Sequence, residues 1–240
     1  QIWSWSAPLG NGETTGLAAW AETVAVLARQ LADETGVIAQ EILRASAGKA
    51  IDQLTVHEAA AAVWRFWITG LADDRAFAMQ ALENVTVAVP HSGIALAYLA
   101  TTRCEAFFAS QTDALMLPSD VLDMFERARS LAPGDPWVEL LRCYGLLFAR
   151  KTTAIEPVIA GLKVVPSSGS FSGMLGGILL ALDDLPDARQ FLARGLVDAP
   201  QQPYWSRVGL VAIELTRDDI AAAARSLEEI PTRIDPVVQT

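Results

Sequence analysis

Four prolines recur along this sequence at intervals close to one fixed length, and they constrain the fold more than any other feature. They are 43, 33 and 34 residues apart, at Pro90, Pro133, Pro166 and Pro200. The first interval becomes about one repeat unit if residues 110–118 form an inserted loop of about ten residues. Each proline follows apolar residues at helical spacing, and proline stops a helix because it has no N–H to donate. The sequence therefore predicts a helical repeat of about 34 residues.

A repeat of this length accommodates two short antiparallel helices, here called helix A and helix B. Such a pair cannot bury its apolar faces alone and must stack on the next pair. Small residues recur where the two helices are expected to cross closely, at Ala100, Cys143, Gly176 and Gly209 in helix A and at Ala154, Ala188 and Ala222 in helix B. We expect four to five pairs between about residues 55 and 230.

The expected helix starts and turns carry suitable capping residues. Thr55 followed by Glu58 is the pattern of a capping box. Asp135 before Pro136 places an N-cap ahead of a proline in the first helical turn, and Pro203 stands in a similar place in the last pair. Three acidic pairs fall at the expected turns between helices A and B, where we interpret them as solvated capping residues: Asp73–Asp74, Asp183–Asp184 and Asp218–Asp219.

The first fifty residues follow a different pattern. Residues 2–5 alternate large and small side chains like the end of a strand, and residues 8–16 are rich in turn formers. From Leu17 to Ile42 apolar residues recur at steps of three and four, which predicts one long amphipathic helix ending near Gly48. We therefore divide the chain into residues 1–50 and a repeat region at residues 51–240, whose last ten residues form a C-terminal cap.

The repeat resembles the tetratricopeptide repeat family. The residues that fall on the family's signature positions are Leu175, Gly176, Ala188, Leu192, Gly195 and Pro200. The resemblance implies an all-α, right-handed superhelical solenoid of helical hairpins, whose A helices line a concave surface that binds extended peptides or partner helices. The sequence departs from the family at the signature tryptophan of helix A, which is missing, and at Trp137, which is out of register.

The order of segments resembles the C-terminal half of certain bacterial regulators. In that family a TolB-like α/β domain precedes the repeats and follows either an OmpR-type winged-helix domain or a class III nucleotide cyclase domain. The resemblance rests on a strand that ends in Gln1-Ile2-Trp3-Ser4, followed by a loop, an amphipathic helix and degenerate repeats. It implies that residues 1–50 are the remnant of the TolB-like domain and that an effector domain lies upstream. The sequence leaves open which effector that is.

Charge and cysteine content exclude several classes of protein. There are 28 acidic and only 18 basic residues, for a net charge of −10, so we expect no direct binding of nucleic acid. Residues 84–102 and 164–182 are the longest charge-free stretches, and prolines interrupt both, so we predict no membrane span. Cys104 and Cys143 lack metal-ligand spacing, which predicts buried thiols in a reducing, cytoplasmic compartment.

Motifs of catalysis and of metal binding are missing from the sequence. His57 and His91 are a whole helical pair apart and have no companion residues at ligand spacing. Trp64 and Trp67 lie three residues apart on one expected helix, which favours core packing over ligand contact. We therefore predict no enzymatic activity, no metal and no cofactor.

The remaining candidate for function is the concave surface. Our candidate groove residues are Tyr98, Arg103, Glu139, Arg142, Trp205 and Arg207, although the arginines could equally pair within the stack. The expected function is regulatory: the domain binds a partner protein or a second copy of itself. The alternative is a small-molecule sensor with a pocket near Gly173, Gly176 and Gly177, where missing side chains leave room.

Overall fold

The computed structural model describes residues 33–110 and 117–228, together with residues 24, 31 and 230. These residues form helices and connecting turns, with no strand among them, so the predicted all-α class is confirmed for this part of the chain. The strand remnant expected at residues 1–5 and the cap expected at residues 231–240 lie outside the described residues.

Ten α-helices follow one another as five A/B pairs between Val56 and Glu228. The A helices are α3 (Val56–Thr69), α5 (Gly93–Ser110), α7 (Pro136–Phe148), α9 (Gly169–Ala181) and α11 (Tyr204–Thr216). The B helices are α4 (Ala72–Ala88), α6 (Ser119–Leu131), α8 (Glu156–Lys163), α10 (Leu185–Asp198) and α12 (Ile220–Glu228). Helix α2 (Val37–Ser46) and the single-turn helix η1 (Ile51–Gln53) precede the pairs, and η2 (Thr152–Ala154) precedes α8.

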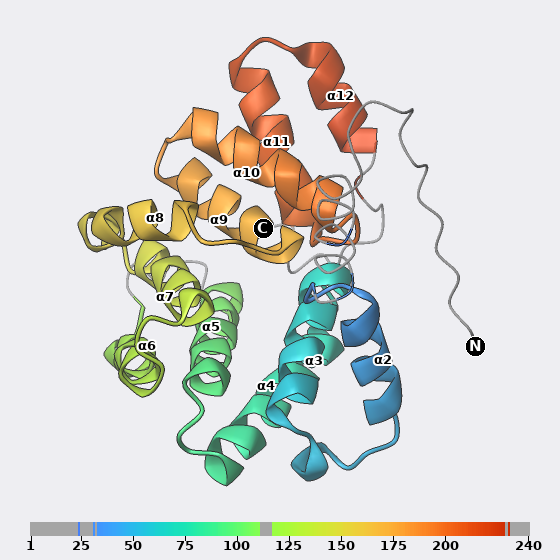
Figure 1. Cartoon of the computed structure of the whole chain (residues 1–240), viewed down its shortest axis with the longest axis vertical. Coiled ribbons are helices and arrows are strands. Elements are labelled where there is room, and N and C mark those ends of the chain that lie inside the picture. The colour runs from blue at the N-terminus through green and yellow to red at the C-terminus, as the bar shows by residue number, and fades with distance from the viewer. Residues whose placement is uncertain (1–23, 25–30, 32, 111–116, 229, 231–240) are drawn as a thin grey trace.

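Each pair stacks on the next in chain order. Consecutive A helices are in contact, from α3 to α5, α7, α9 and finally α11. The B helices α4, α6 and α10 also pack against the A helix of the following pair. In Figure 1 the pairs follow an arc from α3 and α4, through α6 and α8, to α11 and α12. The A helices therefore form one continuous wall of the molecule.

The four prolines mark the ends of four B helices, as predicted. Helices α4, α6, α8 and α10 each end two or three residues before Pro90, Pro133, Pro166 or Pro200. The long first interval arises inside the second pair, where residues 111–118 connect α5 to α6. The predicted insertion therefore lies between an A helix and its B helix.

The predicted helix starts are confirmed. Both halves of the capping box at Thr55 form: the amide of Glu58 donates to the Thr55 hydroxyl at 3.4 Å, and the amide of Thr55 donates to the Glu58 carboxylate at 2.8 Å. The Asp135 carboxylate accepts from the first amides of α7 at 2.9 and 3.1 Å, with Pro136 in the first turn. Pro203 directly precedes α11.

The turns between helices A and B use left-handed backbone geometry rather than side-chain capping alone. In each of four turns, a residue just beyond the end of the A helix has a positive φ. These residues are Gly70 after α3 (67°), Arg150 after α7 (56°), Asp183 after α9 (64°) and Asp218 after α11 (59°). In the last three turns, the next amide donates to a carbonyl five residues back at 2.9–3.0 Å, which closes the A helix. Of the acidic pairs, Asp219 caps α12 as expected by accepting from the Ala222 amide at 2.9 Å.

Small residues allow close helix crossings, with two corrections. Ala100, Cys143, Gly176 and Gly209 are all buried, and a Cβ added at Gly176 would lie 2.8 Å from the backbone nitrogen of Leu192 in α10. In the B helices Ala188 is buried as expected. Ala154, however, lies in the single-turn helix η2, and near the chain end Ala223 is buried in place of the predicted Ala222. The last B helix is thus rotated by one residue from the predicted register.

The long helix predicted from Leu17 to Ile42 is interrupted in the described part of the chain. Asp33 to Gly36 form a turn, and α2 begins only at Val37 and ends at Ser46. The buried Asp33 carboxylate accepts from the amide and hydroxyl of Thr35 at 2.8 and 2.6 Å, which fixes the turn. It also accepts from the amide and hydroxyl of Ser170 at 2.8 and 2.6 Å, at the start of α9. The interruption therefore attaches the N-terminal segment to the fourth pair.

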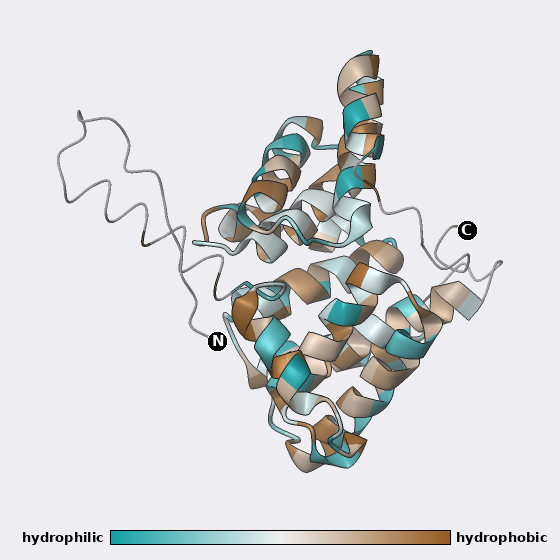
Figure 2. Cartoon of the chain, turned by 90° about the vertical axis from the view of Figure 1, so that its right-hand side faces the viewer, coloured by the Kyte–Doolittle hydropathy of each residue, from teal (hydrophilic) through white to brown (hydrophobic). Residues whose placement is uncertain are grey.

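The core runs through all five pairs. Hydrophilic and hydrophobic residues alternate along most helices in Figure 2, as expected for helices buried on one side. Cys104 and Cys143 are buried, free thiols, as predicted, and burial raises the pKa of Cys143 to about 12. In the part of the chain that the structure describes, no helix has the combined length and apolar character needed to cross a membrane.

Candidate functional site: an aromatic cavity between the A helices

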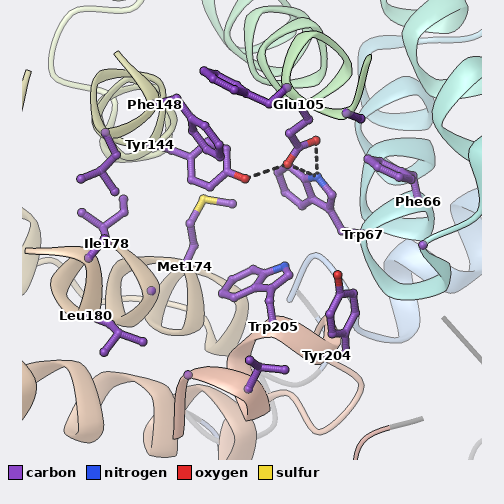
Figure 3. Close-up of a pocket in the computed structure, with 18 of the residues that line it drawn as sticks. Phe66, Trp67, Glu105, Tyr144, Phe148, Met174, Ile178, Leu180, Tyr204 and Trp205 are labelled. Atoms are coloured by element: carbon purple, nitrogen blue, oxygen red, sulfur yellow. Dashed lines mark hydrogen bonds between the residues drawn. The ribbon is translucent and has the colours of Figure 1, made fainter. Parts of the chain in front are cut away.

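A cavity of about 730 Å³ lies on the wall that the A helices form (Figure 3). All five A helices contribute to its lining, although they span more than half of the chain. Most of the lining side chains are aromatic or aliphatic: Phe66, Trp67, Phe108, Tyr144, Leu147, Phe148, Met174, Ile178, Leu180, Tyr204, Trp205 and Val208. The cavity is therefore a product of the stacking of pairs and not of any single pair.

Small residues leave the space that the cavity occupies. Gly177 and Ala181 of α9 and Ala212 of α11 face it. A Cβ added at Gly177 would make ordinary contact with the Trp205 ring, at 3.4 Å, and because Gly177 lines the cavity, a larger side chain there would take up part of its volume. Bulky side chains at these positions would occupy the space between α9 and α11 that now belongs to the cavity.

Glu105 of α5 supplies the carboxylate of the cavity. Its Oε1 accepts from the Tyr144 hydroxyl at 2.9 Å and from Trp67 Nε1 at 3.0 Å, and its Oε2 accepts from the same indole N–H at 2.9 Å. The three residues come from three different A helices, α3, α5 and α7. The carboxylate thus joins the first three pairs across the cavity wall, as the dashed lines of Figure 3 show.

Burial changes the ionisation of this group. Removal from water raises the pKa of Glu105 from 4.5 to about 7, against the opposing effects of the Trp67 and Tyr144 hydrogen bonds and of the Arg75 charge. Burial, followed by the charge of Glu105, raises the pKa of Tyr144 well above its ordinary value, so Tyr144 stays a hydrogen-bond donor. Near neutral pH, small changes around the cavity are therefore enough to change the charge of Glu105.

A row of aromatic rings supports the cavity from behind. Trp64 packs edge to face on Trp67 with 4.8 Å between ring centroids, and on Trp137 at 5.8 Å. Trp137 in turn packs on Phe171 at 5.1 Å, and Trp64 Nε1 donates to the buried hydroxyl of Tyr98 at 3.0 Å. These contacts join α3, α5, α7 and α9, and they fix the ring of Trp67 at the cavity.

The structure separates the six predicted groove residues. Trp205 lines the cavity, whereas Tyr98 is buried in the aromatic row. Arg103 pairs with Glu83 at 2.9 Å, and Arg142, itself buried, pairs with Glu126 at 2.7 Å. Glu139 accepts from Arg129 at 2.8 Å, and Arg207 donates to the carbonyl of Pro200 at 3.4 Å. Their contact with a partner stays a prediction.

The glycines proposed to leave room for a pocket behave differently from one another. Gly173 packs against the buried side chain of Gln202, and Gly176 packs against Leu192. Only Gly177 of the three lines the cavity. The pocket therefore lies one helical turn further along α9 than predicted and faces α5 and α11.

Sequence reasoning missed Glu105, Tyr144 and the exposure of Trp67 to the cavity. A signal was present, because Glu105 is the only acidic residue of the largely apolar helix α5. The aromatic residues near the ends of the first three A helices, Trp67, Phe108 and Phe148, form a second signal at about one repeat length.

Among the described residues no three His, Cys, Asp or Glu side chains are grouped closely enough to hold a metal ion. His57 lies in the first turn of α3 and His91 in the turn before α5, a helical pair apart as expected. No family model matches the chain, and no curated protein matches its sequence. The assignment of the site therefore rests on its geometry and chemistry.

Proposed function

We propose that this domain is a non-catalytic sensor that binds a small, largely apolar molecule in the cavity between its A helices. The observation that carries the proposal is the cavity of about 730 Å³ to which all five pairs contribute. Sites for small ligands commonly enclose about 300–1,000 Å³, with apolar walls and a few polar groups. The aromatic walls and the Glu105 carboxylate match that description.

The repeat architecture explains how such a ligand would act. We propose that the pairs form a right-handed solenoid similar to tetratricopeptide repeats, in which each pair contacts only its neighbours along the chain. A ligand that touches both α3 and α11 adds a contact between the first and the last pair. It would stiffen the array and shift its population toward one curvature. An effector attached to the array would sense that change, as in the bacterial regulators that the sequence resembles.

Binding of a partner protein or a second copy remains the other function predicted from the sequence. The ion pairs of Arg103 and Arg142 engage two of the charged side chains that a peptide was expected to contact. The acidic charge still argues against nucleic acid as a partner. A cytoplasmic location is supported by the two free, buried cysteines.

Filling the cavity tests the proposed function. We use 4-phenylbutan-1-ol as a neutral probe, and we expect a Kd of about 4 mM, from about 0.3 kcal/mol for each of its eleven heavy atoms. Gly177→Leu extends a side chain into the cavity next to Trp205, so it should weaken binding at least tenfold. Calorimetry measures the affinity, and a thermal melt checks that the variant is folded.

Gly161→Leu is the matched control for this substitution. Gly161 lies in helix α8, is exposed, and has no neighbouring atom within 4 Å of an added Cβ. It gains the same helix propensity without touching the cavity. Absence of measurable probe binding to the wild-type protein, or equal binding to the Gly177 variant and the control, would contradict the proposed function.

A further inference from the structure

The cavity holds an asymmetric set of charges. Among the described residues that line it, Glu105 is the only carboxylate and Arg75 is the only basic side chain. The Arg75 guanidinium lies 5.8 Å from the centroid of the Phe66 ring, in a cation–π arrangement. Within the described part of the chain, no ion pair joins Arg75 to Glu105. Glu105 is thus held by neutral donors, and its charge is not matched by direct contact with a cation.

The Glu105 carboxylate also has hydrogen-bonding capacity left over. A carboxylate offers about four acceptor sites. Tyr144 occupies one site on Oε1, and the single N–H of Trp67 is shared between both oxygens. Oε2 therefore has only half of a bifurcated hydrogen bond, and a further donor from the cavity would complete its shell.

The rings around the carboxylate favour a positive charge. Trp67, Tyr144, Phe148 and Trp205 are drawn around the same space as Glu105 in Figure 3. The faces of aromatic rings attract cations, and Trp does so most strongly. An organic ammonium group placed between Glu105 and these rings would gain both an ion pair and ring contacts, whereas an anion would meet the carboxylate and the negative ring faces.

We propose that the cavity recognises an organic amine, with an ammonium group bound by Glu105 and an apolar body lying against the aromatic walls. This inference rests on the proposed function and specifies the chemical class of its ligand. Glu105 acts as the residue that determines specificity. Trp67 of α3 and Tyr144 of α7 orient the Glu105 carboxylate, because each donates a hydrogen bond to it.

Three probes with one carbon skeleton test the charge preference: 4-phenylbutylammonium, 4-phenylbutan-1-ol and 4-phenylbutyrate. Titration calorimetry at pH 8 should place the amine at least tenfold tighter than the alcohol and the carboxylate weakest. Glu105→Gln keeps an acceptor for Trp67 and Tyr144 but removes the charge. This variant should bind the amine at least tenfold more weakly than the wild type does, and its affinity for the alcohol should stay within about twofold of the wild-type value.

Glu83→Gln is the matched control, since it also removes one negative charge but from the ion pair with Arg103 outside the cavity lining. It should leave all three affinities unchanged. If the wild-type protein binds the alcohol or the carboxylate as tightly as the amine, the inference is wrong while the proposed function stands. If none of the three probes binds, the proposed function fails as well. Equal loss of amine affinity in the Glu83 and Glu105 variants would also overturn the inference.

Discussion

The burial of Glu105 predicts a measurable dependence of stability on pH. Its pKa is raised in the folded protein from 4.5 to about 7, chiefly by removal from water. The folded state therefore binds this proton more tightly than the unfolded state. The resulting stability is fully present below pH 4.5 and is lost as the pH rises through about 7. At pH 8 the folded protein carries the cost of a buried negative charge.

The size of this effect follows from the two pKa values. The interval between 4.5 and about 7 corresponds to about 3 kcal/mol if the carboxylate is fully shielded. Glu105 is partly accessible from the cavity, so we expect about 1–3 kcal/mol. Glu105→Gln removes the proton-binding group but retains its shape and an acceptor. The free energy of unfolding of the variant, relative to that of the wild type, should rise by about this amount between pH 4.5 and pH 8.

Urea unfolding of both proteins at pH 4.5, 6, 7 and 8 measures the difference. Other groups titrate equally in both proteins. Glu34 is one of them, because burial also raises its pKa to about 7. The difference in unfolding free energy between variant and wild type therefore isolates Glu105. The charged and titratable groups that interact with Glu105 are Arg75, Tyr144, Tyr204 and Cys104, and none of them is altered. A difference that stays constant within about 0.5 kcal/mol across this range would refute the reasoning.

Two further predictions concern the contacts that position the pairs. Asp33→Asn should lower the free energy of unfolding by about 2 kcal/mol, because the buried carboxylate accepts four hydrogen bonds and links the N-terminal segment to α9. Faster hydrogen exchange at the Ser170 amide would report the loss of this link. Unchanged exchange at that amide would count against it. Thr55→Ala should cost about 1 kcal/mol by removing one half of the capping box of α3. Thermal unfolding measures the latter, with Thr86→Ala, whose hydroxyl bonds only the Glu83 carbonyl, as the control.

The helix boundaries were predictable because local chemistry determines them. Proline cannot continue a helix beyond its first turn because it lacks an N–H, and four of the five B helices end just before Pro90, Pro133, Pro166 and Pro200. The capping box at Thr55 depends only on residues three apart in sequence. Such signals do not depend on the rest of the fold, so these helix boundaries follow from the sequence, whereas the number of pairs was predicted only as four to five.

The interruption at Asp33 was missed because its cause lies far away in sequence. The apolar spacing between Leu17 and Ile42 continues through the turn, and no proline marks it. What holds the turn is the hydrogen bonding of Asp33 to Thr35 and, 137 residues away, to Ser170. A period of three and four residues shows which face is apolar, but it does not show where a helix is broken by a distant partner.

The cavity was predictable only in outline. Gly177 suggested missing volume, but which glycines are filled depends on side chains of other pairs, such as Gln202 against Gly173. Glu105, Trp67 and Tyr144 meet only when α3, α5 and α7 stack. Their spacing of 38 and 39 residues is close to the repeat length, so the stacking brings them together. Identification of such a cluster requires the register of three helices at once.

The first and last A helices line one cavity, and in the proposed function a single ligand contacts both. Nuclear Overhauser effects from bound 4-phenylbutylammonium to the indole protons of Trp67 and Trp205 test it most directly. We predict cross-peaks to both indoles, one from α3 and one from α11. Cross-peaks to only one of them, or to the exposed side chains of Val87 and Val197 on the B helices, would contradict the account.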